Sequence, residues 1–261
     1  MVCKPLGSKP LQSSYHNGTD TVSWFFRGAV IKTYRNEWKY QCKEADLIKI
    51  EAKVQNILQR DENSEGVYTI HSLYFDDLFD SCARDTSDGL FKRSKYRIRF
   101  YGDNPELLFL ERKEKLEGRC HKKRCVITSE EYDRILDGDI NDLLWDTDKE
   151  LLREFCVHSL KRGFSPKAII CYERTAFAEP ITNVRVTFDR NISASDEIDR
   201  FRNGDYLRTP ILPADENLLE VKFDYILQGT YRRIISDEGL TQSSFSKYYL
   251  GRKTLEKKKG K

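Results

Sequence analysis

Apolar residues recur along the chain with two different spacings, and each spacing predicts one kind of element. In eight stretches they occupy every second position, as in a strand whose side chains point alternately to opposite faces. Short turns, such as the Gly-Asp-Asn-Pro run at residues 102–105, separate some of these stretches. The predicted strands are residues 34–42, 67–75, 94–102, 106–115, 119–127, 168–177, 183–190 and 217–224.

Four other stretches have apolar residues three or four positions apart and predict helices. Thr128 and Glu131 form a capping-box pattern at the start of one of them, and Gly163 follows another where a helix stop is expected. Many strands with a few inserted helices predict an α+β protein built on an antiparallel sheet or barrel. The predicted helices are residues 45–59, 128–136, 148–162 and, with a weaker pattern, 225–236.

Six of the eight predicted strands have one charged face and one apolar face. The apolar faces hold aliphatic and aromatic residues, for example Phe100, Phe188 and Phe223. The triplet Glu-x-Lys occurs on three of the strands. The charged faces hold, strand by strand, Arg35, Glu37 and Lys39; Lys95, Arg97, Arg99 and Tyr101; Glu111, Lys113 and Lys115; Tyr172 and Arg174; Arg185, Thr187 and Asp189; and Glu220, Lys222 and Asp224.

Two arrangements fit this pattern, and the charges alone do not decide between them. In the first, an antiparallel sheet turns its charged face to water. In the second, a barrel has a charged interior, and helices cover its apolar exterior. Inward-pointing arginines and lysines repel one another unless an anion neutralises them, and interspersed carboxylates suit a divalent metal. The second arrangement is what a metal-assisted polyphosphate site requires, because arginine binds phosphate oxygens bidentately.

Composition excludes some functional classes. The chain has 261 residues and a formal net charge of only +3, which does not favour a nucleic-acid binder. No apolar run approaches the roughly 18 residues that span a membrane, and no signal-peptide pattern is present. We therefore expect a cytoplasmic protein without membrane insertion. The seven cysteines form no Cys-x-x-Cys pair, so we expect no zinc site.

The chain predicts one domain with an extension at each end. Residues 1–30 are rich in Pro, Ser, Gly and Asn and show no period, which predicts a flexible N-terminal extension. A single domain is expected from residue 31 to residue 255, and the lysine-rich residues 256–261 predict a solvated basic tail. Asp76 and Asp77 resemble a metal pair. Adjacent strand residues face opposite ways, so we expect a turn or strand-end role for them.

Eight segments of the sequence, in order, resemble the VTC domain, which is the polyphosphate-polymerase branch of the CYTH-like triphosphate tunnel metalloenzymes. Together they extend over about residues 33–252. No one segment is decisive, but eight in the family's order are specific. They begin at Tyr34, Ser72, Lys95, Leu110, Tyr172, Val184, Leu219 and Phe245.

The resemblance implies the second arrangement, an antiparallel eight-stranded barrel whose basic interior forms a tunnel covered by helices. It also implies an ATP-dependent polyphosphate polymerase, which transfers the γ-phosphate of ATP onto a growing inorganic polyphosphate chain with Mn²⁺ or Mg²⁺. The implied partners are ATP, polyphosphate and a membrane protein that receives the product, with no nucleic acid.

Site residues follow from the resemblance position by position. Lys39, Lys122 and Ser246 are candidates for substrate binding, and Lys222, on the face of Glu220, joins them. Glu220 is the candidate metal ligand. Ser244 departs from the family, because the fungal catalytic proteins have a lysine at this position. The candidates for contact with the reacting phosphates are Arg97, Arg99, Lys113, Arg174, Arg185 and Lys247.

Two alternative functions remain open. The same tunnel suits a hydrolase that cleaves triphosphate or short polyphosphate. A non-catalytic polyphosphate-binding accessory subunit is the second alternative. Glu220 and the full arginine set argue against the accessory role, whereas Ser244 argues for it.

Overall fold

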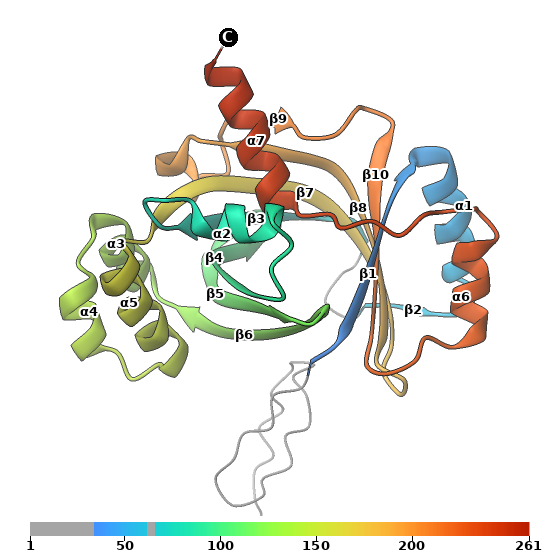
Figure 1. Ribbon diagram of the computed structural model, residues 1–261, viewed down its shortest axis with the longest axis horizontal. Coiled ribbons are helices and arrows are strands. Elements are labelled where there is room, and N and C mark those ends of the chain that lie inside the picture. The colour runs from blue at the N-terminus through green and yellow to red at the C-terminus, as the bar shows by residue number, and fades with distance from the viewer. Residues whose placement is uncertain (1–33, 62–65, 261) are drawn as a thin grey trace, which may run out of the picture. The chain divides into compact units, whose positions relative to one another are not determined.

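The eight predicted strands are all present and belong to one antiparallel sheet. The computed structural model describes residues 34–61 and 66–260, so the expected N-terminal extension lies outside the described residues. Eight strands follow the order β1-β10-β8-β7-β3-β4-β5-β6 (Figure 1), while β2 pairs with β7 and β9 with β8. The strands are β1 Asn36–Lys43, β2 Gln59–Arg60, β3 Tyr68–Asp76, β4 Lys92–Tyr101, β5 Asn104–Leu116, β6 Arg119–Ile127, β7 Ser165–Glu179, β8 Val184–Ser195, β9 Thr209–Pro210 and β10 Glu216–Phe223.

The sheet differs from the expected eight-stranded closed barrel in two ways. It has ten strands, not eight. The two additional strands, β2 and β9, are each two residues long, which is too short for an alternation of side chains to be recognised in the sequence. It also remains open. Among the described residues, the two edges of the sheet are joined by one isolated bridge, between Arg35 and Cys120, and not by a continuous ladder of hydrogen bonds. There each backbone N–H donates to the other residue's carbonyl oxygen, at 2.9 and 2.8 Å. Alternation predicts which face a side chain takes, but it does not predict which edges pair.

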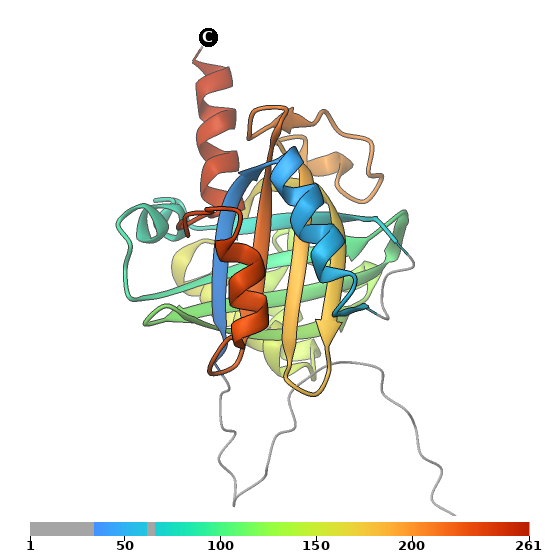
Figure 2. The same ribbon diagram turned by 90° about the vertical axis from the view of Figure 1, so that its right-hand side faces the viewer.

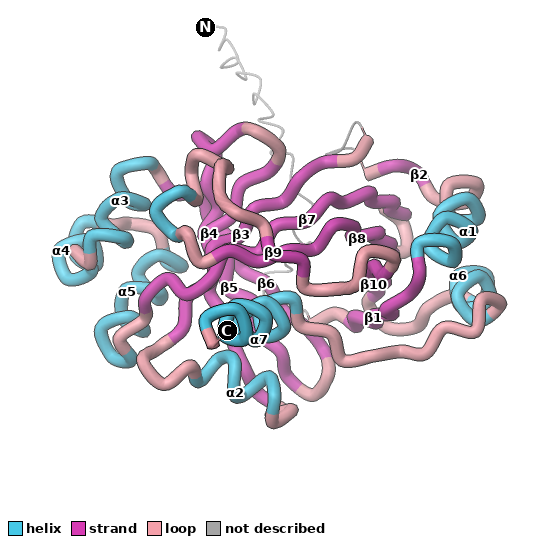
Figure 3. Tube along the Cα trace, turned by 90° about the horizontal axis from the view of Figure 1, so that it is seen from above, coloured by secondary structure: helices cyan, strands magenta, loops and turns pink. Residues whose placement is uncertain are grey.

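Helices cover the apolar outer face of the sheet on two sides. Residues of β4 and β5 such as Ile98 and Leu110 form one core with α3, α4 and α5. Residues of β8 and β10 form a second core with α1 and α6, which lie over β1, β10 and β8 in Figure 2. Seen from above, the two helical groups lie at opposite ends of the sheet (Figure 3). The helices are α1 Glu44–Val54, α2 Ser81–Ser87, α3 Ser129–Asp137, α4 Ile140–Asp146, α5 Glu150–Arg162, α6 Gly229–Ser236, α7 Lys247–Lys259 and a short 3-10 turn, Ile198–Arg200.

All four predicted helices are confirmed, as α1, α3, α5 and α6. The capping box at Thr128 and Glu131 forms as expected, and Gly163 ends α5 in the left-handed conformation. Helix α7 continues through Lys259, and residues 256–260 of the expected basic tail are exposed to solvent. Lysine is a good helix former, so a lysine-rich end extends a helix that already packs on the sheet.

Helix α7 is held against the sheet by a close approach and by a buried hydrogen bond. A Cβ on Gly251 would lie 2.4 Å from Ile170 Cδ1 and 3.1 Å from Ala194 Cβ, so a larger residue would require the Ile170 side chain to move. The Tyr248 hydroxyl donates to Asp76 Oδ2 at 2.8 Å. Asp76 and Asp77 also accept backbone N–H groups at the start of α2, which confirms their strand-end role. These contacts fix where the first residues of α7 lie.

Candidate functional site: a basic cavity inside the sheet

The charged strand faces surround a cavity of about 670 Å³. Residues from α2, from the segment 242–246 and from the first turn of α7 complete its wall. The lining includes twelve lysine and arginine side chains but only two carboxylates, Glu37 and Glu220. All eleven residues expected to bind phosphate or metal line this one cavity, namely Lys39, Arg97, Arg99, Lys113, Lys122, Arg174, Arg185, Glu220, Lys222, Ser246 and Lys247.

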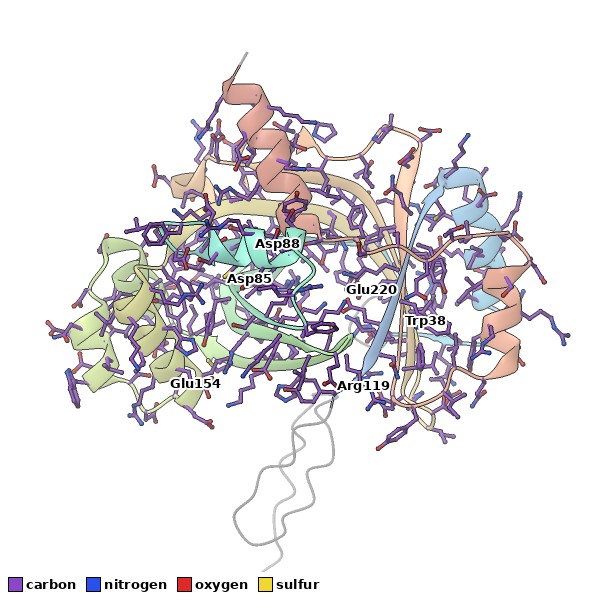
Figure 4. The ribbon with its side chains drawn as sticks, viewed as in Figure 1. Trp38, Asp85, Asp88, Arg119, Glu154 and Glu220 are labelled. Atoms are coloured by element: carbon purple, nitrogen blue, oxygen red, sulfur yellow. The ribbon has the colours of Figure 1, made fainter. Side chains whose placement is uncertain are left out.

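Figure 4 shows how β1 and β10 divide the two environments. Glu220 lies on the side of the enclosed space, whereas Trp38 lies on the side of α1 and α6. The Trp38 ring packs edge-on against Phe223 in the outer core, with centroids 4.9 Å apart. The arrangement with charges inward and apolar residues outward is therefore the one that the chain adopts.

Glu111 organises the cations at the middle of β4. Its carboxylate is fully buried, and Arg97 donates to it from Nε at 2.7 Å. Arg99 and Lys122 lie 3.6 and 3.3 Å from the same carboxylate. Burial alone would raise the pKa of Glu111, but the three cations hold it well below the ordinary value. Glu111 is therefore ionised and holds these three cations in place.

Asp189 has the same relation to two further cations. Arg174 donates to it bidentately, at 2.6 and 2.7 Å, and Lys247 Nζ donates to Oδ2 at 2.6 Å. Burial opposes ionisation of Asp189, but the two cations outweigh it and lower its pKa. Tyr172 lies beside both cations, with Lys247 Nζ 4.6 Å from its ring centroid.

Two glutamates and three lysines alternate where β1, β10 and β5 meet. Lys39 lies between the glutamates, 3.4 Å from Glu37 and 3.5 Å from Glu220. Lys113 donates to Glu37 at 2.5 and 2.7 Å, and Lys222 lies 2.8 Å from Glu220. Burial and the charge of Glu220 oppose ionisation of Glu37, yet the lysines lower its pKa to about 2.

Arg185 and Ser246 occupy separate parts of the wall. Arg185 lies 2.7 Å from Asp61, and its Nη2 donates to the Tyr68 hydroxyl at 3.4 Å. Ser246 is the N-cap of α7, and its Oγ accepts the backbone N–H of Tyr249.

The comparisons with known proteins agree with this geometry. The model of the VTC domain matches residues 34–256. The chain belongs to the VTC domain family. No curated protein matches the sequence.

Several solved structures resemble this VTC domain. They include protein bh2851 from Bacillus halodurans, at 12% identity and a TM-score of 0.48, covering 82% of this chain and 95% of that one. Protein PH1819 from Pyrococcus horikoshii has 13% identity and a TM-score of 0.44, covering 86% of this chain and 99% of that one. No helix in residues 34–61 and 66–260 is long and apolar enough to cross a membrane.

Functional candidates beyond those expected from the sequence line the cavity of this VTC domain or contact its lining residues. Glu37, Glu111 and Asp189 hold the cations in place, and each had been placed on a charged strand face without a role. Tyr74 accepts a hydrogen bond from Arg97 at 2.7 Å. Burial would raise the pKa of this phenol, but Arg97 and Arg99 lower it. Lys95 also lines the cavity, on the row that holds Arg97 and Arg99.

The donor set fits a metal ion that shares its ligands with a substrate. Magnesium and manganese take oxygen ligands, commonly one or two carboxylates together with substrate phosphates. Glu220 and Glu37 supply ionised carboxylates near each other. Thr187, directly opposite Glu220 on β8, has a buried hydroxyl without a hydrogen-bond partner in the described part of the chain. Residues 34–61 and 66–260 contain no group of three His, Cys, Asp or Glu side chains that could hold a metal without substrate.

Proposed function

We propose that this VTC domain is a polyphosphate polymerase that transfers the γ-phosphate of ATP onto the end of an inorganic polyphosphate chain. The observation that carries the proposal is the charge of the cavity, where twelve cations face only two lining carboxylates. Glu111, Asp189 and Asp61, which lie outside the lining, pair with some of these cations. A phosphate chain would neutralise the remaining charge, because it offers acceptor oxygens along its whole length. The family supports phosphate as the anion.

The proposed reaction needs positioning and charge neutralisation more than side-chain chemistry. A terminal phosphate oxygen of the acceptor forms a bond to the γ-phosphorus, while the bond from that phosphorus to the β–γ bridging oxygen breaks and ADP leaves. The attacking oxygen is already an anion, so no side chain must remove a proton. Arg97, Arg99 and Arg174 would bind non-bridging oxygens and offset the charge that develops.

Mn²⁺ or Mg²⁺ would be held by Glu220, with Glu37 nearby, and by phosphate oxygens. Once bound, it would supply Lewis-acid polarisation of the phosphoryl group. Lys39, Lys113 and Lys222 would then exchange carboxylate partners for phosphate oxygens. Ser246 and Lys247, fixed by the docking of α7, would position the chain from the opposite wall.

The test is a gel assay for long-chain polyphosphate, with purified protein, ATP and Mn²⁺. The wild type is compared with Glu220→Ala and with the control Glu216→Ala, which removes a carboxylate from the same strand outside the cavity. We expect polymer from the wild type and the control, and none from Glu220→Ala. Free phosphate without polymer would indicate the hydrolase. Binding of polyphosphate without either product would indicate the accessory subunit.

A further inference from the structure

Three cations that line the cavity near the first residues of β4 differ from its other cations. We name this cluster, Arg93, Lys95 and Lys115, the β4 mouth. Arg93 and Lys95 continue the cavity-facing row of Arg97 and Arg99 along β4. Lys115 lies on β5 directly opposite Arg93. At about 3.3 Å per residue, the row from Arg93 to Arg99 is about 20 Å long.

The β4 mouth has no carboxylate partner among the residues that the structure describes. Arg93 Nη1 donates to the Leu90 carbonyl oxygen at 3.0 Å, and Lys95 Nζ donates to Ser246 Oγ at 3.0 Å. Every inner cation, by contrast, has an Asp or Glu oxygen within 4 Å, as Arg97, Arg174 and Lys222 do. Half-buried like charges without a counterion repel one another. The β4 mouth is therefore the part of the wall whose charge the protein leaves uncompensated.

Other groups of the same cavity wall also suit an anion. The hydroxyls of Ser87, Ser243 and Ser244 line the same cavity. The first turn of α7, a helix of 13 residues, also forms part of this wall. The N-terminus of a helix favours negative charge. Ser87 and Tyr249 form a hydrogen bond at 3.1 Å that ties α2 to α7. Figure 1 shows α2 and the start of α7 side by side.

We propose that the β4 mouth is a second anion subsite, which binds phosphates of a long polyphosphate chain beyond those held at the inner cations. The inference rests on the proposed function, because it assigns a further part of the same substrate. A triphosphate is too short to contact both Arg99 and Arg93, whereas a long chain can contact the whole row. The β4 mouth would thus make the domain prefer long chains over triphosphate. Lys95, which donates to Ser246 Oγ, also places a positive charge beside this serine, two residues along the chain from Ser244.

Binding of two probes to the full chain tests this inference. The probes are tripolyphosphate and long-chain polyphosphate, titrated without metal or nucleotide over a range of salt concentrations. The test variant is Arg93→Gln/Lys95→Gln/Lys115→Gln. The matched control, Lys49→Gln/Lys161→Gln/Lys257→Gln, removes the same charge from exposed positions outside the cavity.

We expect the test variant to bind long chains more weakly, by about tenfold or more. The slope of log affinity against log salt should become shallower by about 2, because the variant lacks three cation–phosphate contacts and its binding therefore releases fewer counterions than that of the wild type. Its affinity for tripolyphosphate should stay within about twofold of the wild type. The control variant should match the wild type for both probes. The charge-preserving variant Arg93→Lys/Lys95→Arg/Lys115→Arg should recover most of the long-chain affinity.

Three results would overturn the inference. One is a test variant that keeps the wild-type affinity and salt slope for long chains. Another is an equal loss for both probes, because the mouth would then not be a separate subsite. The third is a single-stranded RNA homopolymer that binds as tightly as polyphosphate and depends equally on the three cations. If the wild type binds neither phosphate probe, the proposed function itself fails, and that outcome is distinct from the other three.

Discussion

The protonation state of Lys95 predicts how the affinity for polyphosphate changes with pH. Burial lowers the pKa of this lysine to about 7, and no carboxylate in the described part of the chain lies close enough to restore it. The charged and titratable groups around it come from four other places in the fold. Lys39 on β1, Lys113 on β5 and Arg93 on β4 lower its pKa, Cys82 on α2 raises it, and the Tyr248 ring centroid lies 5.4 Å from Nζ.

Lowering the pH should therefore tighten binding of long-chain polyphosphate. Near pH 8 about nine in ten Lys95 side chains are neutral, whereas near pH 6 about nine in ten are charged. An anion bound at the β4 mouth favours the ammonium form, so binding takes up a proton at the higher pH. If the bound state is always protonated, affinity rises by about tenfold from pH 8 to pH 6.

Isothermal titration calorimetry in buffers of different ionisation enthalpy measures both the affinity and the protons taken up. Lys95→Arg should bind tightly at both pH values and lose most of the pH dependence, because arginine stays charged. Lys95→Gln should bind weakly at both. The terminal phosphates of the probe, whose second pKa lies near 6, also titrate in this pH range. In a long chain they are a small fraction of all phosphates, so they contribute little to the pH dependence of binding. An unchanged tenfold pH effect in Lys95→Gln would refute the assignment to Lys95.

Three further predictions concern stability and binding. Glu111→Ala leaves buried arginines without their carboxylate and should lower the free energy of unfolding by about 3–5 kcal/mol in urea titrations, whereas Glu150→Ala, at an exposed ion pair, should change it by less than about 0.5 kcal/mol. Thr128→Ala removes the capping box of α3 and should cost about 1 kcal/mol in the same assay without changing polyphosphate affinity. Tripolyphosphate at about 100 times its Kd should stabilise the wild type by about 2.7 kcal/mol in thermal unfolding, and added salt should reduce this effect.

The sequence predicts the strands and their faces well, because a side-chain period of two leaves little choice of orientation. Ile98 and Arg99 must face opposite ways wherever β4 lies. The period does not tell which face is inside. That choice depends on what covers the apolar side, and here α1, α3, α4, α5 and α6 cover it. Short helices such as α2 show too few turns for a visible period.

The carboxylates of the cavity could not be assigned from the sequence, because their partners depend on strand register and on the placement of α7. Asp189 meets Arg174 through the pairing of β8 with β7. It meets Lys247 only because α7 docks on the sheet, 58 residues further along the chain. Glu37 meets Lys113 where the two edges of the sheet approach. A pattern along one strand contains none of this information.

The two kinds of cation in the cavity have different consequences for a moving phosphate chain. At the inner positions, Glu111, Asp189, Glu37 and Glu220 neutralise part of the cationic charge, so a phosphate that binds there competes with a carboxylate. Such an exchange yields less net free energy than binding to a bare cation, since the displaced carboxylate loses its partner. A long chain held by many weak contacts can advance one phosphate at a time.

At the β4 mouth no carboxylate among residues 34–61 and 66–260 competes, so a phosphate gains the full attraction of its cations. We infer that the chain is held most firmly at this mouth and slides more easily through the interior. A polymerase benefits from this order of affinities, because its product must move after each addition without leaving. A hydrolase that releases short products gains nothing from it. The strength of long-chain binding at Arg93, Lys95 and Lys115 thus bears on which of the two reactions the cavity performs.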